Sequence, residues 1–239
     1  SGTDGSTLLK LSGEKNGDAF GTAVTGDTRD GGTLFIVGAP GAGDGARGRA
    51  YLYRVTADEP LSGTPFAIAD ADETGSSLGG MFMSVLGDVN GDSTPDVYVS
   101  DYSDTALGPA TGKAYVLSGV DGSRIHVLTG YVPGEGFGIG NSDAGDVNAD
   151  GFADLVVGAW QHAGAAPSGG KVYVFSGKDG QLMHTSTGKV QCETFGFDTS
   201  GMGDVDNDGI VDFILTSTWS SVSGFQSGRM FIVSGRNGR

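Results

Sequence analysis

The sequence has 239 residues, a formal net charge of −15 and 45 glycines. That length suits one sizeable domain or two small ones. The acidity argues against nucleic acid and anionic membrane as partners, because both require clustered lysine and arginine. No apolar run approaches the roughly 18–20 residues that cross a bilayer, so we expect no membrane insertion. The single cysteine, Cys192, cannot pair within the chain, which leaves the redox compartment open.

Near the start of the chain, residues 7–12 match the last strand of the repeats that follow. A first, degenerate repeat comes next. It has Phe20-Gly21, the acidic turn GDTRDGG from Gly26 and an apolar strand that ends in Gly38-Ala39-Pro40. This acidic loop is one residue shorter than its later counterparts, and Arg29 falls where a ligand should be. We therefore expect no metal in the first repeat.

Three further repeats carry the acidic loop in full. They read GDVNGDSTPDVYVSDY from Gly87, GDVNADGFADLVVGAW from Gly145 and GDVDNDGIVDFILTST from Gly203, so their first aspartates are 58 residues apart. Each repeat holds four short segments of β-branched and aromatic residues between Gly-rich turns, which is typical of strands. Repeats of four strands at this length predict the blades of a β-propeller.

The predicted fold is all-β, a single β-propeller domain over residues 1–239. Its four blades cover approximately residues 14–69, 70–130, 131–188 and 189–239, and the last blade lacks its outer strand. The spare N-terminal strand, residues 7–12, is expected to complete that blade and close the ring by pairing Leu8–Leu11 with the strand around Phe231. The alternative is that the chain is a fragment of a larger ring.

The three full loops predict three Ca²⁺ sites. Oxygen side chains stand at loop positions 1, 3, 5 and 9, and the residue at position 7 offers its backbone carbonyl, a donor set that suits Ca²⁺. An EF-hand is excluded, because it needs a bidentate Glu at position 12 and flanking helices. The alternative is an Asx-rich turn without metal. The candidate ligands are Asp88, Asn90, Asp92, Thr94, Asp96; Asp146, Asn148, Asp150, Phe152, Asp154; and Asp204, Asp206, Asp208, Ile210, Asp212.

These motifs resemble the FG-GAP repeats of integrin α propellers and of many bacterial extracellular proteins. The resemblance rests on Phe-Gly, the DxNxDGxxD loop and Gly-Ala-Pro, and it covers nearly the whole chain. Gly79-Gly80 replaces Phe-Gly in the second repeat, and four repeats stand here where integrin propellers have seven blades. The resemblance implies an extracellular setting, secreted or on the cell surface, which fits millimolar calcium.

A second candidate site lies after the second strand of each repeat. Tyr102, Trp160, His162 and Trp219 are expected on the face opposite the calcium loops, formed by loops 41–48, 103–112, 161–170 and 219–228. Exposed aromatic rings there would stack on sugars or anchor a protein. The alternative is that the rings only cap the core.

The function that we predict is a non-catalytic, calcium-stabilised binding or adhesion module for a glycan or an extracellular protein. Neither an HExxH motif nor a P-loop is present. The alternatives are a polysaccharide-active enzyme on a propeller scaffold, by fold-level analogy alone, and a purely architectural repeat of a larger surface protein.

Overall fold

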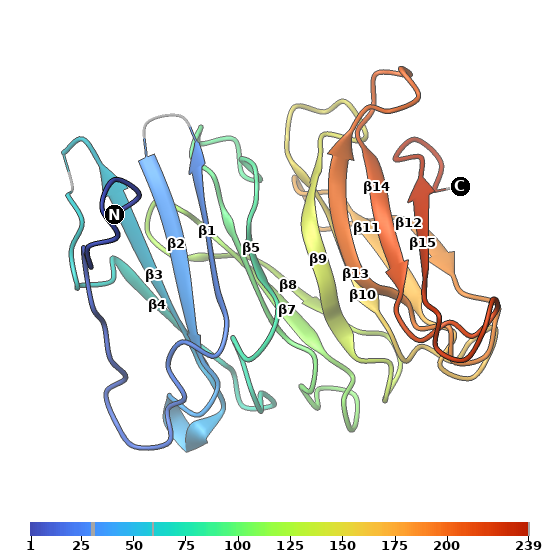
Figure 1. Cartoon of the computed structure of the whole chain (residues 1–239), viewed down its shortest axis with the longest axis horizontal. Helices are drawn as coiled ribbons and strands as arrows, with labels where there is room; N and C mark the ends of the chain where they lie inside the picture. Colours follow the sequence, from blue (N-terminus) through green and yellow to red (C-terminus); the bar gives the residue numbers. More distant parts are fainter. Residues whose placement is uncertain (30–31, 59, 239) are drawn as a thin grey trace.

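The computed structural model describes residues 1–29, 32–58 and 60–238. It consists of four antiparallel sheets that follow one another in chain order, from blue to red in Figure 1. The first three sheets have four strands each and the last has three. We call them blades 1 to 4. The expected all-β fold with one sheet per repeat is confirmed.

The strands of each blade pair with their neighbours in sequence. Blade 1 contains β1 (Val24–Arg29), β2 (Gly32–Ala39), β3 (Arg49–Thr56) and β4 (Ala67–Asp70). Blade 2 contains β5 (Met83–Val85), β6 (Val97–Asp101), β7 (Lys113–Leu117) and β8 (Arg124–Thr129). Blade 3 contains β9 (Phe137–Gly145), β10 (Asp154–Ala159), β11 (Lys171–Phe175) and β12 (Leu182–Thr187), and blade 4 contains β13 (Phe195–Gly203), β14 (Asp212–Ser217) and β15 (Arg229–Val233). The one helical element in the described ranges is a 3₁₀ turn, Asp44–Ala46, and no helix there has the length and apolarity that a membrane span requires.

The core lies between neighbouring blades. Because successive side chains of a strand point to opposite faces, Val97 and Val99 of β6 pack between blades 1 and 2, whereas Tyr98 packs between blades 2 and 3. Blades 3 and 4 approach so closely that a Cβ on Gly158 would lie 1.9 Å from the carbonyl oxygen of Gly196. Middle strands buried on both faces explain the continuous apolar runs after each acidic loop.

The acidic loops join the first and second strands of blades 2, 3 and 4. In blade 3 the ladder ends at the pair Gly145 and Asp154, and residues 146–153 form the loop. In Figure 1, β13 runs upward and β14 runs downward, so the loop between them lies at the upper edge. The loops that follow the second strands lie at the opposite edge, where the turn Asp44–Ala46 is seen.

Blade 1 departs from this pattern. If Gly38-Ala39 is aligned with Gly158-Ala159, Leu34 is the equivalent of Asp154. The ladder does not stop at the pair of Asp27 and Leu34 but continues through Thr28 with Thr33 and Arg29 with Gly32. On the other side, β2 stays paired with β3 as far as Thr56. Where the other blades begin their acidic loops, blade 1 therefore has a three-stranded extension of its ladder.

The ring closure expected from the N-terminal segment is not seen. Residues 7–12 form no strand, and Leu11 packs with Phe20 against Tyr51 on the outer face of blade 1. Blade 4 stands at the other end of the row (Figure 1), and its β15 pairs with β14 alone among the described strands. The apolar face of blade 1 thus holds the segment in place, while Met230 and Ile232 on β15 are 57% and 54% exposed.

Candidate functional site

The aspartate at position 9 of each acidic loop is a buried clamp. Asp154 is completely buried, and its carboxylate accepts hydrogen bonds from the amides of Val147 and Gly177, both at 2.9 Å. Asp96 and Asp212 accept from the corresponding amides in blades 2 and 4. Each clamp ties the start of the acidic loop to the turn after the third strand, so position 9 sets where the loop sits on its blade.

The aspartate at position 1 gathers the backbone of the loop itself. Asp146 accepts hydrogen bonds from the amides of Asp150 at 3.0 Å and Gly151 at 2.8 Å. Asp204 does the same with Asp208 and Gly209 in blade 4. The loops curl around their first aspartate, which brings the oxygens of positions 1, 3 and 5 to one side.

The loop of blade 4 has the donor set and spacing of a cation site. Carboxylate oxygens of Asp204, Asp206 and Asp208 all lie within 4.8 Å of one another. Oxygens that share a Ca²⁺ at about 2.3–2.6 Å lie no more than about 5 Å apart, so these three fit one ion. Asn90 and Asn148 offer an amide oxygen at the position of Asp206 in the other two loops. The residues present therefore fit the group that the sequence predicts.

Charge accumulates in these loops. Burial, together with the carboxylates at positions 1 and 5, raises the pKa of Asp96 and of Asp154 to about 6, and the two amide hydrogen bonds to each oppose this shift. The pKa of Asp206 is also raised, by desolvation and then by the charges of Asp208, Asp212 and Asp204. A cation held in the loop would offset this repulsion.

On the opposite edge, the structure brings two of the four predicted ligand-binding residues together. Trp160 and Trp219 have ring centroids 5.1 Å apart, and Phe197 lies 5.7 Å and 5.0 Å from them. Phe82 of blade 2 joins edge-on, 6.3 Å from Phe197. All four rings are half-buried. We call them the aromatic cluster. The indole N–H of Trp160 is buried and has no hydrogen-bond acceptor among the described residues.

The other two predicted residues make other contacts. His162 turns to Glu135, with 2.6 Å between its Nδ1 and a carboxylate oxygen, and the hydroxyl of Tyr173 donates to the same oxygen at 2.8 Å. Glu135 is 1% exposed and its other oxygen accepts the amides of Tyr131 and Val132. This carboxylate is enclosed and saturated, so the group fastens loops and offers no open acid or base. Tyr102 is half-buried beyond β6 and joins none of the described ring contacts.

Comparison with known proteins finds similarity to the FG-GAP repeat and to integrin α subunits. Residues 140–175 match the model of the FG-GAP repeat. Integrin alpha-E of Mus musculus is 29% identical over 167 residues, which cover 62% of this chain and 14% of the integrin. Integrin alpha-2 of Mus musculus is 27% identical over 220 residues, which cover 83% of this chain and 18% of the integrin. The chain thus spans less than a fifth of these relatives.

A solved structure supports the fold independently. The Dos1 propeller matches with a TM-score of 0.51 at 13% identity, over 86% of this chain and 43% of that one. Identity this low shows a shared arrangement of blades and nothing about ligands. The four blades described above correspond to somewhat less than half of that propeller chain.

Proposed function

Since the chain is a β-propeller of FG-GAP repeats related to integrin α subunits, we propose that it is a non-catalytic, calcium-stabilised binding module of an extracellular setting. Its partner is a glycan or an extracellular protein, and the partner meets the edge opposite the acidic loops. The observation that carries this proposal is the aromatic cluster, because Trp160, Phe197 and Trp219 form one half-exposed apolar patch. Aromatic rings of this kind dominate protein and sugar recognition.

Calcium has a structural role in this proposal. The ligands would be the side chains at positions 1, 3, 5 and 9 of each loop, together with the carbonyl groups of Thr94, Phe152 and Ile210. When bound, Ca²⁺ supplies positive charge that neutralises the crowded carboxylates and fixes the loop. The chain's own contribution is the clamp at position 9, which holds each loop on its blade.

Chelation tests the calcium proposal. With free Ca²⁺ about tenfold above Kd, each site stabilises the folded state by roughly 1.4 kcal/mol, so EDTA should lower the melting temperature clearly. Magnesium at the same concentration is the control, because it demands a smaller, stricter octahedral shell. A melting temperature unaffected by EDTA and calcium would overturn the metal assignment.

Binding is tested by a glycan array and by capture of extracellular protein, both in calcium. We expect Trp219→Ala to lose the partner, whereas Ile68→Ala, a change at a 47% exposed residue of β4, keeps it. Equal binding by wild type and Trp219→Ala would remove the aromatic cluster from the interface. Absence of any glycan or protein partner for a folded, calcium-loaded protein would contradict the binding function and favour an architectural repeat.

A further inference from the structure

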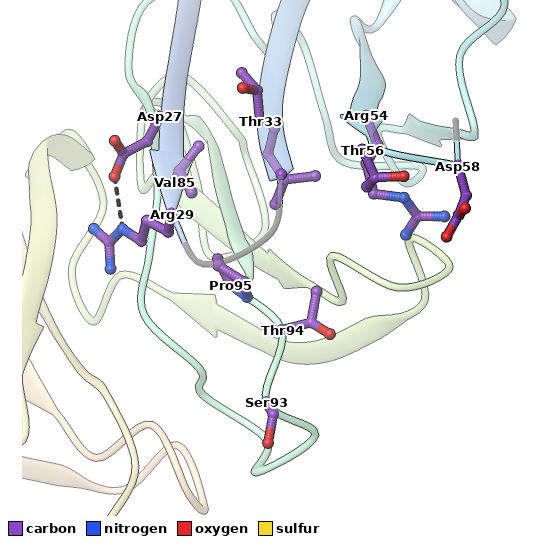
Figure 2. Close-up of a pocket in the computed structure, with 12 residues that line it drawn as sticks. Asp27, Arg29, Thr33, Arg54, Thr56, Asp58, Val85, Ser93, Thr94 and Pro95 are labelled. Carbon is purple, nitrogen blue, oxygen red and sulfur yellow. Dashed lines mark hydrogen bonds and ion pairs between the residues drawn. The ribbon is translucent and has the colours of Figure 1, made fainter. Parts of the chain in front are cut away.

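A cavity of about 370 Å³ opens between blades 1 and 2, at the edge that carries the acidic loops. One wall is the three-stranded extension of blade 1, which contributes Arg29, Thr33 and Thr56. The facing wall is the acidic loop of blade 2, with Thr94 and Pro95, and Figure 2 shows these two residues across from the strand ends. The aromatic cluster lies at the opposite edge, so this is a separate place on the molecule.

Two departures from the repeat meet at this cavity. The first is the ladder of blade 1, which continues past the pair Asp27–Leu34 and so raises one wall. The second is Ser93, in the opposite wall, whose φ is +67° where the loops of blades 3 and 4 have Gly151 and Gly209 at +91° and +88°. Blade 2 instead has its glycine at position 4, Gly91 at +82°, where blades 3 and 4 have Ala149 and Asn207 at +60° and +62°. The blade 2 loop therefore presents a side chain to the cavity at position 6.

The charges around the cavity favour an uncharged ligand. The guanidinium of Arg29 donates to Asp27 at 2.6 Å and to Asp143 at 2.9 Å, and that of Arg54 donates to the carbonyl oxygens of Gly119 and Val120 at 3.0 and 3.1 Å. Both cations are thus engaged by protein groups. Among the described residues, the charged side chains that line the cavity are two arginines and two aspartates, Asp27 and Asp58, whose formal charges cancel. An anionic ligand would find no net attraction here.

The remaining lining suits a molecule with many hydroxyl groups and one apolar face. The side chains of Thr33, Thr56, Ser93 and Thr94 carry hydroxyls, which both donate and accept hydrogen bonds. Thr33 is oriented by a 2.9 Å hydrogen bond with Thr28. Leu34 and Val85 add an apolar surface, on which the C–H face of a sugar ring would rest. The volume lies at the lower end of the roughly 300–1,000 Å³ of small-molecule sites, enough for one or two rings.

We propose that the cavity between blades 1 and 2 is a binding site for a neutral mono- or disaccharide. This goes beyond the proposed function, since it is a second ligand site at the other edge. It shares one element with that proposal, because Ser93 and Thr94 belong to an acidic loop. Their amides are held by Asp88 and Asp92 at 2.7 and 2.8 Å. The test is therefore made with calcium present, so that loop disorder does not obscure it.

The test is a titration followed by methyl NMR of Thr33, Leu34, Val85 and Thr94. The probes are glucose, galactose, mannose, lactose and cellobiose, with galacturonic acid as the anionic comparator. We expect at least one neutral sugar to shift these methyl signals at millimolar concentration, and galacturonic acid to bind no better than galactose. Both tryptophans of the chain, Trp160 and Trp219, lie in the aromatic cluster. Their fluorescence should stay unchanged, which separates this site from the proposed interface.

The decisive variant is Thr94→Phe, because phenylalanine already stands at this loop position in blade 3 as Phe152. The loop should accept the ring, and the ring should fill the cavity and weaken the sugar at least about tenfold. Ser123→Phe, at an exposed turn position of the same blade, is the matched control. Three results would overturn the proposal: no response to any neutral sugar, unchanged affinity in a folded Thr94→Phe, or a clear preference for galacturonic acid.

Discussion

The buried clamp at position 9 predicts how Asp154→Ala destabilises the protein even without calcium. The substitution removes both acceptors of the amides of Val147 and Gly177, which lie at 2.9 Å from a fully buried carboxylate. A buried amide left without a partner costs about 1–3 kcal/mol. Relief of the buried charge, whose pKa is raised to about 6, offsets part of this loss. We expect a net loss of about 1–3 kcal/mol at pH 7.

Asp146→Ala is the matched control in the same loop. Its carboxylate accepts the amides of Asp150 and Gly151, and Gly151 is exposed, so water replaces the lost acceptor. In EDTA we expect a loss of under about 1 kcal/mol, as for most surface substitutions. Urea denaturation of both variants, with EDTA and with calcium, measures the difference. Asp154→Asn, which keeps one acceptor, should fall between them. Equal destabilisation by both alanine variants in EDTA would refute the clamp.

Further predictions follow from buried charge and from strain. Since burial raises the pKa of Asp96 and Asp154 to about 6, above the ordinary value of 3.8, the penalty for ionising them is full above pH 6 and fades as pH falls towards 4. In EDTA, chemical denaturation should therefore show stability rising from pH 7 to pH 5, by about 1 kcal/mol per site; a fall over this range would contradict the assignment. Lys113→Met should lower the free energy of unfolding by about 3–5 kcal/mol, because it leaves the fully buried carboxylate of Asp104 without the ammonium group that lies 3.2 Å away. A loss under about 1 kcal/mol in urea denaturation would mean that the ion pair is dispensable. Ser93→Gly should stabilise by about 1 kcal/mol, since φ +67° suits glycine, and a lower urea midpoint would show that the serine is unstrained.

The number and order of the blades could be predicted from the spacing of the repeats. The spacing of 58 residues between acidic loops becomes one sheet per repeat, because each loop precedes a middle strand that must be buried on both faces. The place of residues 7–12 could not be predicted this way. Their pattern suits an edge strand on any blade, and contacts of Leu11 with Phe20 and Tyr51, which no periodicity encodes, hold them on blade 1.

The candidate sites also have features that the sequence predicts and features that depend on contacts between distant residues. Position 9 was expected as a ligand on chemistry alone, and its role as a clamp depends on Gly177 and Gly119, 23 residues further on. Trp160 and Trp219 lie close together, as their equivalent positions in the repeat predict. Phe197 could have been predicted as their neighbour, because it directly follows a Phe-Gly pair. The hydrogen bond of His162 to Glu135, which lies 27 residues earlier, has no sequence signal.

Because no described strand closes the row of blades, the blades are expected to differ in how readily they unfold locally. The strands β6, β7 and β10 are buried along their whole length and have blades on both sides, whereas four of the five residues of β15 are at least partly exposed and it pairs with β14 alone. In stacked repeats each unit is held by its nearest neighbours. Amide hydrogen exchange should therefore start at β15 and advance inward, with blades 2 and 3 protected until global unfolding. Local unfolding is thus expected to begin at blade 4, so this outermost blade sets the resistance of the protein to proteases. The middle blades set its equilibrium stability.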